Sequence, residues 1–114
     1  MNAPDFAHRW IADWNAHDLD AVLAHYADDV DFRSPKVARF TGGAKDRFAA
    51  REDLRPYFAR AFELRPDLRF DLAHVCTDGA GVALVYANEL GETAVETMDL
   101  NEAGEIVRAR VFYG

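Results

Sequence analysis

Cysteine is almost absent from this sequence, which has Cys76 alone among its 114 residues. A single cysteine can form neither an internal disulfide nor a cysteine-based metal site. The chain also lacks the run of about 18 apolar residues that a membrane-spanning helix needs. Its first five residues lack the basic and apolar regions of a signal peptide. We therefore expect a cytoplasmic protein that does not enter a membrane.

Positive charge is the second scarcity, because 13 lysine and arginine residues face 20 aspartate and glutamate residues and give a net charge of -7. No basic cluster stands out, and an acidic surface repels phosphate backbones, so we do not expect a nucleic-acid partner. His8, His17 and His25 follow no metal-ligand pattern, so we predict no metal site. No nucleophile elbow of a serine hydrolase is present either.

What the chain does contain is enough apolar material for one core, since half of its residues are apolar and 29% are charged. At this length we expect a single domain over residues 1–114. Phe6, Trp10 and Trp14 share one helix face before a break at residues 15–17. Asp18 then fits the N-cap of a second helix. The buried stripe of that helix is predicted to be Leu19, Val22, Leu23 and Tyr26.

A third helix is predicted over residues 52–64, and the segment 36–50 has no clear period. Long loops of this kind often cover the mouth of a pocket. Apolar and polar residues alternate in the rest of the chain, which is typical of half-buried strands. The predicted strands are 29–34, 68–76, 82–89, 94–100 and 106–113.

Glu96 is the polar residue that this alternation makes most interesting. It shares its strand face with Ala94, Met98 and Leu100, so we expect it in the middle of an apolar row. Burial without a donor would raise the pKa of this carboxyl group, as a general acid or base at neutral pH requires. Two alternatives stay open: Glu96 pairs with a buried arginine, or the strand register is displaced by one residue.

Two further polar residues fall on apolar faces. His74 shares a row with Phe70, Leu72 and Cys76, and it is our second catalytic candidate, although most core histidines are hydrogen-bonded structural residues. Ser34 ends the apolar row of the first strand. A serine before a proline more often belongs to a turn than acts as a nucleophile.

Aromatic side chains on the predicted apolar faces complete a candidate small-molecule site with Glu96 at its base. Aromatic residues at helical spacing are usually core, but buried tyrosine and tryptophan seek hydrogen-bond partners. A cavity lined by such residues suits a small, mostly apolar ligand. The ligand-binding candidates are Trp10, Trp14, Ser34, Tyr57, Tyr86, Asn88 and Met98.

Four segments resemble the SnoaL-like branch of the nuclear transport factor 2-like superfamily: W-N-A-H-D-L-D, A-D-D-V-D-F-R-S-P, P-D-L-R-F and the ending L-N-E-A-G-E-I-V-R-A-R-V-F-Y-G. The resemblance covers essentially the full chain. It implies an α+β fold of the cystatin-like type, a cone-shaped barrel in which the N-terminal helices pack in the concave face of a strongly bent, mostly antiparallel sheet. It also implies a homodimer through the sheet. These motifs are specific for the fold and weak for function.

Functional residues of the relatives can be compared with this chain position by position. The ketosteroid isomerases that it resembles have a first-helix tyrosine where this chain has Trp10, and a base aspartate where it has Ser34. Only their second acid has a counterpart, Glu96, so we do not expect isomerisation by that mechanism. The Asp–Arg–Asp set of limonene-type epoxide hydrolases has no match. SnoaL-like polyketide cyclases fit better, since they work mainly with one acidic residue in an apolar cavity.

Two functional hypotheses follow. In the first, the cone holds a small, mostly apolar molecule, and Glu96 supplies single-carboxylate acid/base chemistry of the isomerase, cyclase or hydratase type, with His74 or Tyr86 orienting the substrate and no cofactor required. In the second, the protein is a non-catalytic module for ligand binding or dimerisation. A third possibility is that the aromatic side chains themselves fill the cone.

Overall fold

A computed structural model describes residues 3–114, which form four helices and six strands. In chain order these are α1 (Ala3–Asn15), α2 (Leu19–Leu23), β1 (Tyr26–Arg33), α3 (Pro35–Phe40), β2 (Arg47–Phe48), α4 (Arg51–Leu64), β3 (Phe70–Asp78), β4 (Gly81–Asn88), β5 (Thr93–Leu100) and β6 (Ile106–Tyr113). Within the described part of the chain, no helix is long and apolar enough to span a membrane.

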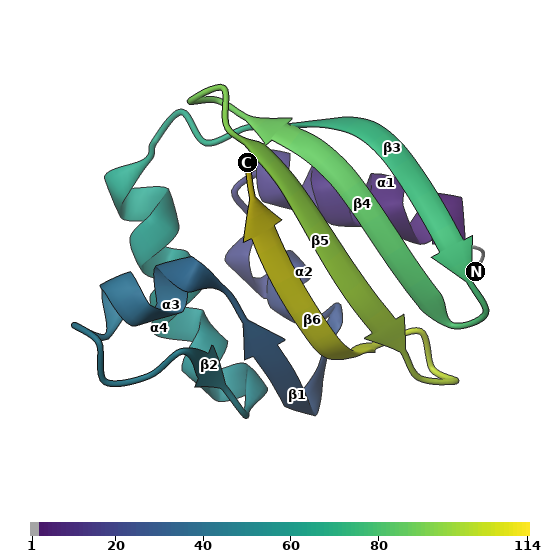
Figure 1. Cartoon of the computed structure of the whole chain (residues 1–114), viewed down its shortest axis with the longest axis horizontal. Helices are drawn as coiled ribbons and strands as arrows, with labels where there is room; N and C mark the ends of the chain where they lie inside the picture. Colours follow the sequence, from purple (N-terminus) through teal and green to yellow (C-terminus); the bar gives the residue numbers. More distant parts are fainter. Residues whose placement is uncertain (1–2) are drawn as a thin grey trace.

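The strands form one mixed sheet in the order β2-β1-β6-β5-β4-β3, in which only the β1–β6 pairing is parallel. The helices lie against one face of this sheet, and the other face is uncovered by helices (Figure 1). The predicted α+β class and mostly antiparallel sheet are therefore confirmed. The sheet has two edges, β2 and β3, so it stays open and does not close into a barrel.

Helix α1 is anchored to the sheet by its apolar stripe and by its last residue. Phe6, Trp10 and Trp14 are each at most 5% exposed, as the helical spacing predicts. The Asn15 side chain donates to the Phe70 carbonyl oxygen (2.9 Å) and accepts from the Phe70 N–H (2.7 Å), so it joins the end of α1 to the start of β3. Asp18 caps α2, because its carboxylate accepts from the Ala21 N–H at 3.1 Å.

Strand β1 begins at Tyr26, earlier than predicted, and this changes the place of a key residue. The sequence put Tyr26 on the stripe of the second helix, but that helix ends at Leu23. Tyr26 instead pairs in register with Ile106 of β6, and the Ile106 N–H donates to the His25 carbonyl oxygen at 2.8 Å. Pairing with a strand 80 residues away is invisible to a local helical pattern, so the local prediction was wrong here.

The segment predicted as a loop contains a short helix and a strand, α3 and β2. Ser34 starts α3 as its N-cap, since the Ser34 Oγ accepts from the Lys36 N–H at 3.2 Å. Pro35 follows in the first turn, where the missing N–H costs nothing. The serine–proline pair that ends β1 is therefore the same pair that starts the next helix.

The placement predicted for His74 is wrong because β3 contains a β-bulge. The register with β4 shifts between Leu72 and His74: Leu72 lies opposite Tyr86, whereas Val75 lies opposite Leu84. One extra residue in a strand moves all later side chains to the other face. Val75 therefore takes the inward position, and His74 and Cys76 are exposed.

Candidate functional site

Glu96 lies where the alternation of β5 puts it, between the buried residues Ala94 and Met98, and is 3% exposed. The predicted row is confirmed, and the register is not displaced. No arginine or lysine pairs with it in the described structure. Instead, the Tyr86 hydroxyl donates to the Glu96 Oε1 at 2.8 Å. The Glu96 Oε2 is buried and has no hydrogen-bond partner among residues 3–114.

Desolvation has the largest effect on the pKa of the Glu96 carboxyl group. Burial raises the pKa of the Glu96 carboxyl from 4.5 to about 8, and the Tyr86 hydrogen bond lowers it by a smaller amount. At neutral pH the side chain therefore carries a proton and is a hydrogen-bond donor as well as an acceptor. A group that titrates near pH 8 is suited to both giving and taking a proton.

A cavity of about 70 Å³ lies beside Glu96, and we call it the inner cavity. Both tryptophans and all four tyrosines of the chain line it: Trp10, Trp14, Tyr26, Tyr57, Tyr86 and Tyr113. Three phenylalanines and Val111 add apolar wall. Six aromatic residues with polar atoms therefore line the same cavity as one carboxyl group.

The polar atoms of these rings are only partly paired. The Trp10 Nε1–H donates to the Tyr26 hydroxyl at 3.2 Å. The Trp14 Nε1–H lies near the same hydroxyl but does not reach hydrogen-bond geometry. In the described residues, it and the Glu96 Oε2 are the two buried side-chain atoms without a hydrogen-bond partner. An unpaired buried polar atom costs about 1–3 kcal/mol. Unpaired buried groups of this kind are found at catalytic sites and where a water molecule or an ion binds.

The tyrosine hydroxyls keep their protons throughout the working range of pH. Burial is the main cause and the charge of ionised Glu96 adds to it, so the pKa of Tyr57 rises to about 12. The pKa of Tyr26 and that of Tyr86 are also raised by the same two causes. These hydroxyls can therefore donate hydrogen bonds to a ligand oxygen, but they do not act as bases.

Ser34 closes one side of the inner cavity and is 5% exposed. Its hydroxyl is close enough to Tyr57 and Tyr113 to lower the pKa of each. The same hydroxyl caps α3. Ser34 thus has the structural role that the sequence favoured, at a position that also borders the site.

A wider hollow of about 500 Å³, which we call the basin, shares four lining residues with the inner cavity: Lys36, Tyr57, Ala61 and Arg65. The two spaces therefore adjoin. The Lys36 ammonium is fixed there, 3.1 Å from the Glu92 carboxylate and 4.2 Å from the Tyr113 ring centre. The Arg65 guanidinium makes two hydrogen bonds of 2.7 Å to Glu89.

Some of the predicted ligand-binding residues lie elsewhere. Asn88 holds the β4–β5 turn: its Oδ1 accepts from the Leu90 and Glu92 N–H groups at 3.0 Å each. Met98 is buried at the other end of β5, beside a separate hollow. With the exposed His74, these residues are outside the inner cavity. The structure does bring together Trp10, Trp14, Ser34, Tyr57, Tyr86 and Glu96.

Four polar lining residues of the inner cavity were missed at the level of sequence. Tyr26 was hidden by the helical pattern before it, whereas Tyr113 continues the apolar row of the last strand and could have been found from that alternation. No sequence pattern marked Lys36 or Arg65 as a site residue. Each lies at the end of a helix and reaches the site only through the packing of α3 and α4.

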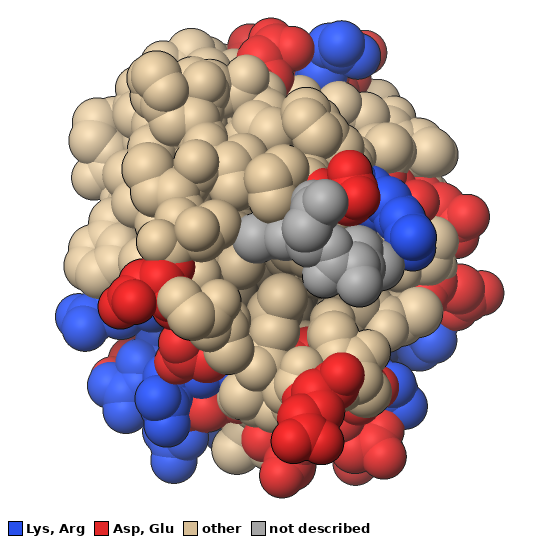
Figure 2. Space-filling model, turned by 90° about the vertical axis from the view of Figure 1, so that its right-hand side faces the viewer, with Lys and Arg blue, Asp and Glu red and all other residues tan. Residues whose placement is uncertain are grey.

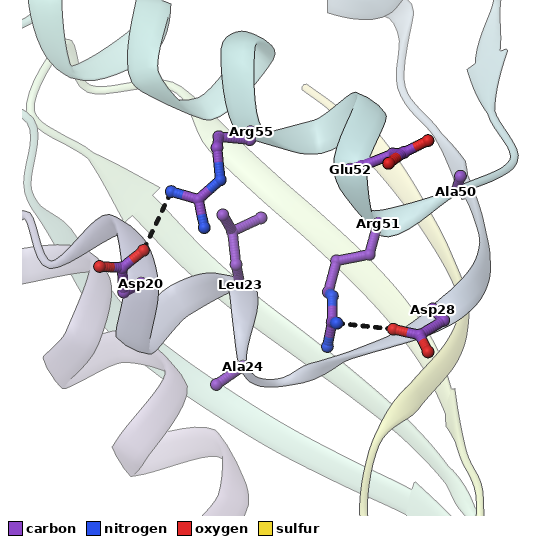
Figure 3. A pocket seen from close by; sticks show the side chains of 8 residues that line it. All are labelled: Asp20, Leu23, Ala24, Asp28, Ala50, Arg51, Glu52 and Arg55. Atoms are coloured by element: carbon purple, nitrogen blue, oxygen red, sulfur yellow. Dashed lines mark ion pairs between the residues drawn. The ribbon is translucent and has the colours of Figure 1, made fainter.

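A second large groove lies between α2, the start of β1 and α4, and Figure 3 shows its lining. Arg55 pairs with Asp20 at 2.9 Å and Arg51 with Asp28 at 2.6 Å, across the groove. Its lining contains no aromatic residue, and its arginines already have acidic partners. We interpret this groove as a hydrated contact in which the two ion pairs connect α4 to α2 and β1. Within residues 3–114, no group of three histidine, cysteine, aspartate or glutamate side chains could hold a metal ion.

Comparison with known proteins points to one family. The model of the SnoaL-like domain matches residues 7–109. The chain is 33% identical to a SnoaL-like protein of unknown function from Burkholderia thailandensis E264, with a TM-score of 0.91 over 98% of this chain and 94% of that one. No curated protein matches.

More distant structures share the fold. The epoxide hydrolase/cyclase-like enzyme SalBIII is 21% identical, with a TM-score of 0.76 over 98% of this chain and 90% of its own. A protein from Sinorhizobium meliloti, proposed to be a polyketide cyclase, is 15% identical, with a TM-score of 0.77 over 96% and 94% of the two chains. At such identities the likeness supports the fold alone.

Proposed function

The chain belongs to the SnoaL-like domain family, and from this premise we propose that it acts on a small, mostly apolar organic molecule whose oxygen-bearing end enters the inner cavity and meets Glu96. The observation that carries this proposal is the Glu96 carboxyl group itself. It is buried among aromatic rings, has one oxygen held by Tyr86, and has the other oxygen unpaired within the described structure.

The proposed chemistry uses one carboxyl group as both acid and base. Because the pKa of Glu96 is about 8, its proton is present at neutral pH and can be given to a carbonyl, hydroxyl or epoxide oxygen of the ligand. The resulting carboxylate then takes a proton from another atom of the same ligand. The two transfers regenerate the enzyme, as isomerase, cyclase and hydratase reactions require.

The size of the inner cavity limits what can enter it. A water molecule takes up about 30 Å³ of liquid volume, so 70 Å³ holds only a few heavy atoms. Only the reacting tip of a ligand fits beside Glu96, and the body remains in the basin. The aromatic rings thus fill most of the cone, in line with the third possibility, but they leave space at the functional carboxyl group.

The related structures suggest which reactions to try first. SalBIII is described as an epoxide hydrolase/cyclase-like enzyme with a role in pyran ring formation in the polyether salinomycin. In a ring closure of that type, Glu96 would protonate the epoxide oxygen as its C–O bond breaks, and the attacking hydroxyl would form the new C–O bond and return a proton to Glu96. The atoms and charges balance without an additional reactant.

The test is turnover of a panel of hydroxy-epoxides and small cyclic enones, followed by chromatography and proton NMR, because ring closure and isomerisation leave the mass unchanged. We expect the wild-type protein to convert at least one compound and Glu96→Gln to bind that compound but not convert it. Glu52→Gln, on the exposed surface of α4, is the matched control and should behave as wild type. Undiminished conversion by Glu96→Gln would show that another group does the chemistry.

The alternative function, a non-catalytic ligand-binding or dimerisation module, is supported by the outer face of the sheet. Ala83, Val85 and Val95 point away from the helices and are only half-buried. Phe112 on β6 is 44% exposed. Figure 2, viewed from the side of β3, shows a broad uncharged area with charges gathered at its border. We propose a homodimer through this face. A cytoplasmic location stays a prediction from the sequence.

A further inference from the structure

We propose that the basin selects the ligand by its charge: it binds an amphipathic carboxylate, with the carboxylate at Arg39 and Arg60 and the apolar body against Phe40, Leu64 and Leu90. This inference rests on the proposed function, because it places the opposite end of the same ligand at Glu96. It adds the substrate class, an organic acid with an apolar body, to the site already described.

The charge of the basin is opposite to that of the protein. The chain has 20 acidic and 13 basic residues. The basin nevertheless has one acidic lining residue, Glu92, and four basic ones: Lys36, Arg39, Arg60 and Arg65. A positive hollow on an acidic protein concentrates anions at that hollow and repels them from most of the remaining surface.

Two of the four cations have no strong partner among residues 3–114. Lys36 and Arg65 are held by Glu92 and Glu89. Arg60 pairs only with Glu63, and this pair is exposed to water on both sides (51% and 66% of the side chains), so it is weak and exchangeable. Arg39 has no ion pair among the described residues. Guanidinium groups of this kind bind carboxylates through two parallel hydrogen bonds.

The basin also contains an unusual concentration of exposed apolar side chains. Four large hydrophobic side chains are exposed in the described residues, and three of them line this one hollow: Phe40 (42% exposed), Leu64 (63%) and Leu90 (67%). They come from α3, the end of α4 and the β4–β5 turn, which meet at one end of the sheet (Figure 1). Exposed apolar side chains that converge on a hollow of about 500 Å³ mark a binding site for a small molecule.

The lining residues also set the direction of the ligand. Lys36 and Arg65 border both the basin and the inner cavity, whereas Arg39 and Arg60 border the basin alone. The guanidinium groups of Arg39 and Arg60 are therefore on the side away from Glu96. A ligand with its carboxylate there reaches past Tyr57 and Ala61, which line both spaces, and presents its other end to the protonated Glu96.

The experiment compares octanoate with octanol, which has the same carbon chain without the charge, by calorimetry at low salt. We expect octanoate to bind about tenfold more tightly than octanol, as a charge-assisted pair would give. The double variant Arg39→Gln/Arg60→Gln should lose this preference and keep its affinity for octanol. Arg55→Gln is the matched control, because Arg55 is on the same helix with a similar exposure but borders the other groove (Figure 3).

Several outcomes would overturn the inference: equal affinity for octanoate and octanol, a preference that survives in the double variant, or no binding of either compound. Tighter binding of octyl phosphate than of octanoate would assign the basin to phosphate esters instead. Binding to anionic lipid vesicles without binding of free octanoate would assign it to a membrane surface. Each of these results contradicts the proposal.

The same variants separate this inference from the proposed function. Glu96→Gln should keep the preference for octanoate, since the charge is recognised in the basin. If Glu96→Gln loses turnover and no charge preference exists, the proposed chemistry stands and the basin assignment is wrong. If the charge preference exists and Glu96→Gln loses nothing, the basin assignment stands and the chemistry is wrong.

Discussion

Glu96 is removed from water by its neighbours on β5 and by the aromatic rings of the helices, and none of them offers it a cation. Among the described residues, the only hydrogen bond to its carboxyl group comes from Tyr86, which is two residues from Leu84, the residue directly opposite Glu96 on β4. A single hydroxyl donor offsets part of the loss of hydration, so the acid stays protonated at neutral pH. This explains how one carboxyl group without a metal or a charged partner can be poised for proton transfer.

The raised pKa of Glu96 predicts a pH dependence of stability. The folded chain holds the proton up to about pH 8 and the unfolded chain only up to about 4.5, so the stabilisation is complete below 4.5 and is lost as the pH rises to 8. Relative to Glu96→Gln, the wild-type free energy of unfolding should fall by up to about 5 kcal/mol across this window. Urea unfolding of both proteins at several pH values measures the difference. A difference that does not change with pH would contradict the prediction.

Single residues also show the limit of sequence analysis. Period-2 alternation found Glu96, because β5 runs without a bulge through that position. The same reasoning failed for His74, because a bulge after Leu72 reverses the faces of β3 and leaves no mark in the apolar pattern. Asn88 was found on the correct inward face, but its amide is used by the β4–β5 turn.

Among the structural elements, the short ones were hardest to predict. The long helices α1 and α4 follow their apolar periodicity: α4 agrees with the predicted 52–64 to within one residue, and α1 ends at the predicted break but begins at Ala3, before the predicted start. Helices α2 and α3 have five and six residues, too few to establish a period. They depend on their N-caps and on tertiary packing. The N-cap Asp18 was predictable from its side-chain chemistry, whereas α3 was not expected after Ser34.

The contribution of the α2 N-cap to stability can be tested by substitution. Asp18→Ala removes the acceptor for the Ala21 N–H and should lower the free energy of unfolding by about 1 kcal/mol. Asp18→Asn is the matched control, because asparagine caps helices about as well as aspartate. Urea unfolding measures both values. Equal losses in the two variants would mean that the charge of Asp18, rather than its capping hydrogen bond, stabilises the helix.

The two proposed interaction faces lie on opposite sides of the molecule. The helix side encloses the inner cavity and the basin, and the outer side of the sheet presents half-buried aliphatic residues without a covering layer (Figure 1). An apolar sheet face of this kind is suited to association with a second copy. Ligand binding on one side and dimerisation on the other are therefore compatible, and the two proposed functions can hold together.

The proposed dimer predicts a simple change in mass. Val85 lies opposite Val95 at the centre of the outer face. Val85→Lys places a charge there, so it should convert a dimer to a monomer at micromolar concentration, as measured by light scattering. Ala103→Lys, in the exposed β5–β6 turn, should leave the mass unchanged. A monomeric wild-type protein would refute the dimer.

The central claim is that Glu96 is a neutral acid at the base of the inner cavity, and its carboxyl carbon can be titrated directly. Carbon NMR on protein with labelled glutamate, with the Glu96 signal assigned by its loss in Glu96→Gln, gives the pKa of this one group. We expect a midpoint of about 8. A midpoint near the ordinary value of 4.5 would show that Glu96 is ionised at neutral pH, and would contradict both the proposed acid chemistry and the burial on which it depends.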